Sequence, residues 1–146
     1  MNKYLVFVIA ILISLTGYFF VEKYYNPKQF ESIGNALEKN DLIRLKSPRS
    51  GSLVQSPLLV QGLARGYWFF EASFPVKLYD SNDVLLGIGI AQAIGEWMTE
   101  EFVSFQATLE FATPATKEGT LVLEKDNHSG LPEHADELRV PIRFQK

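Results

Sequence analysis

A strict alternation of apolar and polar residues from position 103 to 111 constrains the fold more than any other feature. The run VSFQATLEF has an apolar residue at every odd position and a polar one at every even position. Side chains along a β-strand point alternately to opposite faces, so a period of two gathers all the apolar side chains on one face. The segment is therefore predicted to be a strand with one face on a core and the other in solvent.

Six further segments have the composition of strands, and polar or Gly/Pro-containing turns separate them. They span 42–46, 56–64, 74–79, 84–94, 119–125 and 138–144. The cluster DSND at 80–83 consists of turn formers and predicts a hairpin. Pro141 cannot donate a hydrogen bond to a ladder, so the last strand is expected at a sheet edge or with a bulge. Seven short strands with no helical crossover predict an all-β domain at 42–146, an antiparallel β-sandwich of two sheets.

An uncharged apolar run, YLVFVIAILISLTGYFFV, occupies positions 4–21. As a helix it would rise about 27 Å, close to the roughly 30 Å of a bilayer's hydrocarbon core. Lys3 precedes the run, while Glu22 and Lys23 nearly cancel after it, which favours a cytoplasmic N-terminus. Residues 1–25 are therefore predicted to be a single-pass membrane anchor with the domain outside. The alternative is a cleaved signal peptide, but the run lacks a small-residue cleavage site.

The segment 26–41 has the signature of a short linker helix. Asn26 fits the N-cap and Pro27 the first helical position, and Phe30, Ile33 and Leu37 fall on one face. This helix is expected to pack on its own domain or at the membrane surface. A stalk that pairs with another chain is the alternative.

The composition excludes several classes of function. There are no cysteines, so neither a disulfide framework nor a cysteine-ligated zinc can form. The chain carries 14 Lys and Arg against 17 Asp and Glu, with no basic run. Nucleic-acid binding calls for a basic face, and it is therefore not expected.

Three stretches of the chain resemble one known family. They are SPLLVQGLARGYWFFEASFPVKLYD from position 56, GEWMTEEFVSFQATLEF from position 95 and LEKDNHSGLPEHADELRVPIRF from position 123. In this order they resemble the immunoglobulin-like domain associated with bacterial spore-germination proteins of the GerM type. The resemblance runs from about Ile43 to Phe144. It implies a cell-envelope domain with an immunoglobulin-like sandwich, and it brings no catalytic residues with it.

The sequence offers no constellation for catalysis, and no catalytic site, cofactor or metal is predicted. Both histidines, His128 and His134, lie in the polar loop 126–136 beside Ser129, without an oxyanion motif. The oxygen-bearing side chains of this loop could surround a metal ion, yet their spacing fits no calcium loop or zinc site. Turn formation explains the loop better. The adjacent carboxylates at 100–101 and 136–137 are interpreted as solvated charge, because neighbours on a strand point apart.

The aromatic stretch 67–70 is the candidate binding site. Counting back by two from Phe74 predicts that Trp68 and Phe70 point inward and Tyr67 and Phe69 outward, unless a bulge intervenes. These rings either close one end of the core or form an exposed recognition patch. Trp97 and Met98 are expected to meet the stretch, and Arg65 and Glu71 to pair with each other or with a ligand. The candidate binding residues are Arg65, Tyr67, Trp68, Phe69, Glu71 and Trp97.

The predicted function is that of a non-catalytic, membrane-anchored interaction module outside the cytoplasm. Its partner would be another envelope protein or a second copy of the chain, bound at a sheet edge or at the aromatic end. The alternative is a carbohydrate-binding domain that holds cell-wall glycan on exposed rings of Tyr67, Trp68 and Trp97.

Overall fold

The structure is a computed structural model that describes residues 35–145. The predicted anchor at 1–25 lies outside the described residues, as does the first part of the predicted linker helix. Eight strands follow, β1 (Ile43–Ser47), β2 (Leu53–Val54), β3 (Leu58–Arg65), β4 (Ser73–Asp80), β5 (Leu85–Ile94), β6 (Phe102–Leu109), β7 (Glu118–Glu124) and β8 (Glu137–Phe144). Two 3₁₀ turns, η1 (Gly66–Trp68) and η2 (Pro132–His134), lie between them. The prediction of an all-β domain is confirmed, and all seven predicted strands are present.

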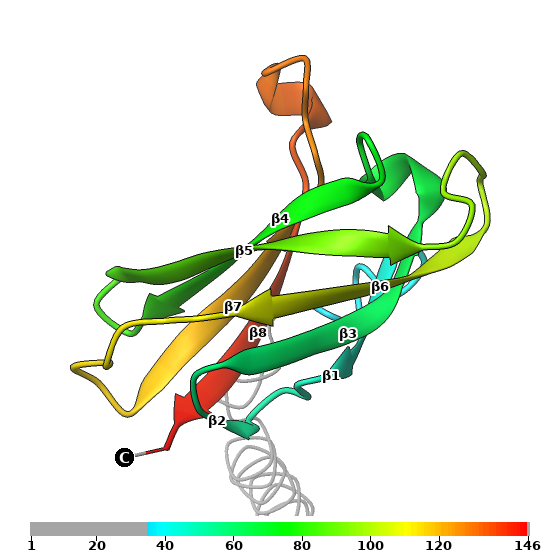
Figure 1. The fold of residues 1–146 in the computed structure, drawn as a ribbon. Helices are drawn as coiled ribbons and strands as arrows, with labels where there is room; N and C mark the ends of the chain where they lie inside the picture. The colour runs from blue at the N-terminus through cyan, green and yellow to red at the C-terminus, as the bar shows by residue number, and fades with distance from the viewer. Residues whose placement is uncertain (1–34, 146) are drawn as a thin grey trace, which may run out of the picture. The chain divides into compact units, whose positions relative to one another are not determined.

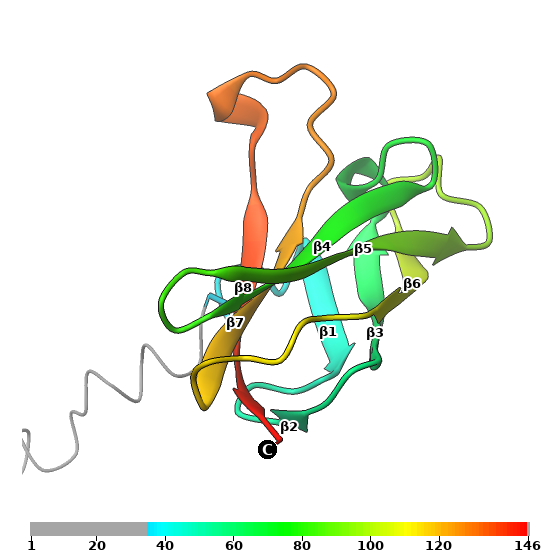
Figure 2. The ribbon, with the colours of Figure 1, turned by 60° about the vertical axis from the view of Figure 1, so that its left-hand side comes forward.

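The eight strands form a single curled sheet in the order β1-β3-β6-β5-β4-β7-β8-β2. Figure 2 shows the curl, with β1 and β3 on one side and β7 and β8 on the other. β5 joins the two halves, since it pairs with β4 over most of its length and with β6 at Gln92–Ile94. The two layers of the expected sandwich are therefore connected through β5 rather than separate. The short β2, which has no periodicity to reveal it, pairs parallel to the end of β8.

Glycines let β5 approach β6 where the two strands are not paired. A Cβ on Gly87 would lie 2.4 Å from the carbonyl oxygen of Glu110. A Cβ on Gly89 would lie 3.1 Å from the carbonyl oxygen of Thr108. Any larger residue at Gly87 would push the strands apart, so this glycine helps the sheet to curl.

The core lies between the two halves of the curled sheet and consists of the inward residues of each strand. Along β6 and β8 burial alternates residue by residue, as the sequence pattern predicts. Phe74 lies at the centre, with ring centroids 4.9 Å from Phe105 and 5.1 Å from Phe69. The apolar face of each strand thus packs against the facing half of the same sheet.

Pro141 lies on the outer side of β8, where it needs no donor. On that side the N–H of Arg139 donates to Oδ1 of Asn35 at 2.7 Å, and the N–H of Arg143 donates to the carbonyl of Ser52 at 2.8 Å. Pro141 falls between them, paired with Thr120 of β7 on its inner side. β8 is not the edge strand that the sequence predicts, because β2 pairs with its end at Arg143 and Phe144, but Pro141 lies before that pairing begins.

The turn predicted between β4 and β5 is held by one buried carboxylate. Oδ1 of Asp80 accepts from the N–H groups of Asn82 at 2.8 Å and Val84 at 3.0 Å. Asp83 takes a φ of 59°, a left-handed conformation that Asp tolerates better than most residues. The hairpin prediction is confirmed, and the first Asp of DSND supplies its cap.

Residues 35–42 form turns rather than the predicted helix. Asn35 pairs with the edge of β8 through its backbone and side chain, including a bond from Nδ2 to the carbonyl of Glu137 at 2.9 Å. Lys39 then forms an ion pair with Asp136 at 2.5 Å. These bonds hold the segment against β8 and the residue before it, and the helix-type bonds from the N–H of Lys39 to Asn35 and from the N–H of Ile43 to Lys39 close single turns only. Among the described residues, no helix is long and apolar enough to cross a membrane.

Candidate functional site

The aromatic stretch is a 3₁₀ turn and a tight bend, not a strand. The N–H of Phe69 donates to the carbonyl of Gly66 at 3.2 Å, which closes η1. Glu71 and Ala72 then adopt φ values of 49° and 62°, and Phe70 bridges back to Ser73. A rule of alternate faces holds only along an extended strand, so it cannot be carried back from Phe74 through this bend.

The bend changes which rings are buried. Trp68 is 0% and Phe69 5% exposed, whereas Tyr67 is 49% and Phe70 38% exposed. The predictions for Trp68 and Tyr67 are correct, and those for Phe69 and Phe70 are wrong. Phe70 instead stacks on His128, with ring centroids 4.5 Å apart and an interplanar angle of 17°. Trp68 and Phe69 belong to the core, so of the rings in this stretch only Tyr67 and Phe70 are exposed.

The loop between β5 and β6 closes over this end of the molecule. The backbone at 97–99 lies directly on Gly66, whose N–H donates to the carbonyl of Glu101 at 3.1 Å. Trp97 is half-buried against the core, while Met98 is exposed. The predicted meeting of this segment with the aromatic stretch is confirmed, and it occurs through the backbone.

Arg65 is held by its own domain rather than by Glu71. Nε donates to the carbonyl of Asp41 at 3.0 Å, and Nη1 donates to the carbonyl of Glu100 at 3.2 Å and lies 3.7 Å from a carboxylate oxygen of Glu101. Its guanidinium also lies 4.1 Å from the ring centroid of Phe102. Glu71 lies in the left-handed bend described above. The predicted Arg65–Glu71 pair does not form.

The loop 126–136 uses its polar groups to hold its own shape. Oγ of Ser129 donates to Oδ1 of Asn127 at 2.6 Å and lies 2.9 Å from Nδ1 of His134. The N–H of Leu131 also donates to Oγ of Ser129 at 3.3 Å, so this hydroxyl is held by three neighbours within the loop. Asn127 in turn donates to the carbonyl of Leu131 at 2.8 Å. This is a network that braces a turn, as the sequence interpretation holds.

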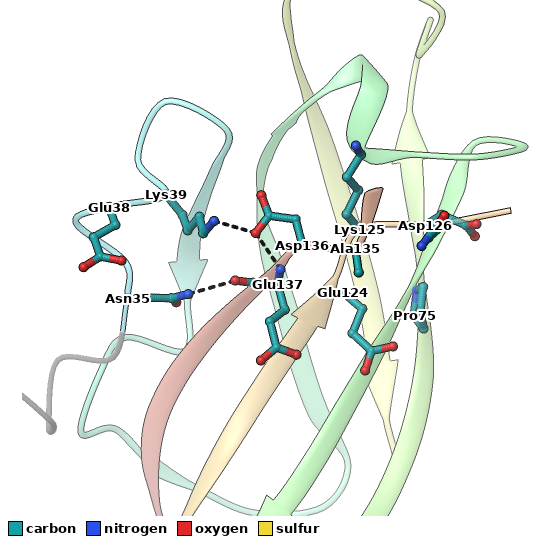
Figure 3. A pocket seen from close by; sticks show the side chains of 11 residues that line it. Asn35, Glu38, Lys39, Pro75, Glu124, Lys125, Asp126, Ala135, Asp136 and Glu137 are labelled. Atoms are coloured by element: carbon teal, nitrogen blue, oxygen red, sulfur yellow. Dashed lines mark hydrogen bonds and ion pairs between the residues drawn. The ribbon is translucent and has the colours of Figure 1, made fainter. Parts of the chain in front are cut away.

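An open hollow of about 730 Å³ lies between the turns at 35–42, the last residue of β7 and the first residue of β8. Figure 3 shows Lys39 and Asp136 pointing toward each other at its wall, and Asn35 reaching Glu137. Glu124 of the same wall is held by Lys77 at 2.7 Å. Over the described residues, no three His, Asp or Glu side chains come together to hold a metal ion. The acidic lining of this hollow is thus largely engaged in ion pairs.

The ion pair of Lys77 and Glu124 gives a pH dependence that can be tested. The hydrogen bond to Glu124 raises the pKa of Lys77 above its ordinary 10.5. A raised folded-state pKa gives stability that is fully present below pH 10.5 and is lost as pH rises through the folded value. We expect the stability difference between the wild type and Lys77→Met to shrink above pH 10.5, measured by urea titration. Lys46→Met, at an exposed position of β1, is the control and should show no such change; equal behaviour of both variants would contradict the assignment.

The outward face of β3, β6 and β5 is a candidate surface that sequence reasoning missed. Arg65 and Phe102 lie at one end of this face, and the outward residues beyond them are Leu59, Gln61 and Leu63 on β3, Ser104, Gln106 and Thr108 on β6, and Ile90, Gln92 and Ile94 on β5. Figure 1 shows the three strands side by side. Arg65 is the only charged residue in these strands, whereas β4, β7 and β8 carry seven. We call this surface the uncharged face, and the scarcity of charge along its strands is the signal that could have revealed it.

The comparison with protein families fits this architecture. The model of the Gmad2 family, described as an immunoglobulin-like domain of bacterial spore germination, matches residues 42–130, well over half of the chain. The chain belongs to this family. The resemblance seen in the sequence is thereby confirmed, and the Gmad2 match begins just before β1 and ends in the loop before β8. No curated protein and no solved structure matches the chain.

Proposed function

We propose that the chain is a non-catalytic interaction module of the bacterial cell envelope. In this proposal residues 1–25 anchor it in the membrane, and the Gmad2 domain outside binds another envelope protein or a second copy of the chain. The observation that carries the proposal is the uncharged face. Charged residues are depleted at the centres of protein interfaces, as they are on this face, which also exposes four large apolar side chains among neutral polar ones.

The polar groups that could support catalysis have structural partners instead. Ser129 and His134 brace a loop, Arg65 braces the aromatic end, and Asp136 is paired with Lys39. Membership of a family of immunoglobulin-like domains supports the same conclusion. The apolar run at 4–21 supports the membrane location.

Glycan binding has no comparable support. A sugar platform needs coplanar exposed rings, and the three proposed were Tyr67, Trp68 and Trp97. Trp68 is fully buried and Trp97 is half-buried, which leaves Tyr67 alone at the surface. We therefore retain the protein-binding function.

The test uses the full-length chain with a photo-reactive amino acid in place of Ile90 on the uncharged face. We expect the protein in the membrane fraction at its uncleaved mass, resistant to high salt and alkaline pH. Illumination should produce heavier adducts with protein, because Ile90 would lie at the interface.

The matched control carries the same amino acid in place of Arg143, an exposed residue on the outward side of β8. Adducts should be much weaker from this position. Recovery of a soluble form that begins after residues 18–25, or equal adducts from both positions, would refute the proposal.

A further inference from the structure

The pattern of residues on the uncharged face carries an inference about what binds there. Gln106 of β6 is paired with Gln61 of β3 on one side and with Gln92 of β5 on the other. Nε2 of Gln61 donates to Oε1 of Gln106 at 3.0 Å. Three glutamines thus form a row across the middle of three strands.

Four large apolar side chains lie at the corners of a rectangle, and the row of glutamines crosses the middle of it. Leu63 and Ile94 lie on either side of Ser104, two residues from the row in one direction. Leu59 lies beside Thr108 in the other direction, and Ile90 lies two residues before Gln92 on the same face of β5. These four side chains are 37–59% exposed. The face is therefore a cross of neutral polar groups with an apolar side chain in each quarter.

This arrangement is complementary to itself. An isologous interface has a two-fold axis in the plane between two copies, and it brings the same patch of both subunits together. A two-fold axis through Gln106 can run along β6 or across it. In both cases the apolar side chains at the corners face those of the second copy, and the glutamines face the glutamines. A glutamine amide carries both donors and acceptors, so it can pair with the same amide of another copy.

The distribution of charge determines where a second copy meets the least repulsion. Residues 35–146 carry 11 Lys and Arg against 15 Asp and Glu, a net charge of −4, so two domains repel each other over most of their surfaces. The uncharged face is where two copies meet with few like charges opposed, because Arg65 at its end is the one charged residue of β3, β5 and β6.

From this pattern we propose that a second copy of this chain docks on the uncharged face, Gln106 opposite Gln106. The proposal rests on the proposed function and names the partner that this function leaves open. Three strands about 4.8 Å apart make a footprint smaller than the roughly 800 Å² per partner of a typical stable interface. Association is thus weak in solution, and confinement of both copies in one membrane would raise their effective concentration.

Single-cysteine variants can test this contact cleanly, because the chain has no cysteine of its own. The experiment uses the full-length chain in membranes and a short bis-maleimide that spans the ~10 Å between facing sheets. Gln106→Cys should give a crosslinked species of twice the chain's mass. Glu118→Cys, on the outward face of the charged half, is the matched control and should give at most a tenth as much.

A second change tests whether the crosslink reports this interface or only chance encounters. Ile94→Glu in the Gln106→Cys chain places a charge at one corner and should reduce the dimer at least fivefold. Val84→Glu, at an equally exposed position in the β4–β5 turn, should leave it unchanged. The melting temperature of each variant shows that the domain remains folded, since both side chains are exposed.

The outcomes separate the inference from the proposed function. Equal dimer from Glu118→Cys, no dimer from Gln106→Cys, or no effect of Ile94→Glu would overturn the second copy as partner. If Gln106→Cys then gives no dimer while the photo-reactive chain still forms adducts of other masses, the interaction module stands with a different partner. If neither variant forms adducts, both proposals fail.

Discussion

Replacing Trp68 by alanine is expected to lower the free energy of unfolding by about 3 kcal/mol, at the lower end of the range for a buried aromatic. The indole is fully buried and belongs to the hydrophobic core at the aromatic end. Within the described residues its Nε1 has no hydrogen-bond partner. An unpaired buried donor is itself unfavourable, so its removal offsets part of the lost packing. Urea titration measures the difference.

Tyr67→Ala is the matched control, because Tyr67 belongs to the same 3₁₀ turn and is half exposed. It should cost less than about 1 kcal/mol, as surface substitutions do. Phe69→Ala should resemble Trp68→Ala, and Phe70→Ala should resemble Tyr67→Ala. Equal losses at all four positions would show that the whole stretch is core, which contradicts the burial described above.

The aromatic end shows why the sequence predicts strands better than bends. Along β6 and β8 the period of two is uninterrupted, so the buried face follows from the sequence alone. Between Gly66 and Ser73 the chain passes through a 3₁₀ turn and two residues of positive φ. Glutamate and alanine seldom adopt a positive φ, so the residues at 71 and 72 give no sign of the bend in the sequence. The inward pair is therefore Trp68 and Phe69, adjacent in sequence, which no strand pattern would place together.

The way in which the sheet curls on itself could likewise not be predicted from the local sequence pattern. Periodicity assigns the two faces of β5, but its neighbours depend on tertiary pairing with both β4 and β6. The same is true of the uncharged face. Each strand's outward residues can be listed from the sequence, yet only the register shows that the three glutamines form one row. The scarcity of charge in the three strands can be read from the sequence, but their arrangement into one continuous face follows only from the strand order.

Gly66→Ala is expected to destabilise the domain by about 3 kcal/mol or more, at or above the upper end for overpacking. A Cβ at this position would lie 1.8 Å from the carbonyl oxygen of Thr99 and 2.4 Å from that of Trp97. Both are backbone atoms, so no side-chain rotation can relieve the overlap. The loop at 97–99 would have to leave Gly66, which would uncover the core beside Trp68.

Gly95→Ala provides the comparison within the same loop. No atom lies within 4 Å of a Cβ there, but φ is +99°, a conformation that alanine adopts with strain. Its expected loss is therefore about 1 kcal/mol. Urea titration of both variants, with limited proteolysis where Gly66→Ala is too unstable to titrate, ranks them. A loss at Gly66 no larger than the loss at Gly95 would mean that the loop moves aside easily, and the aromatic end would then be a mobile flap rather than the closed end of the core.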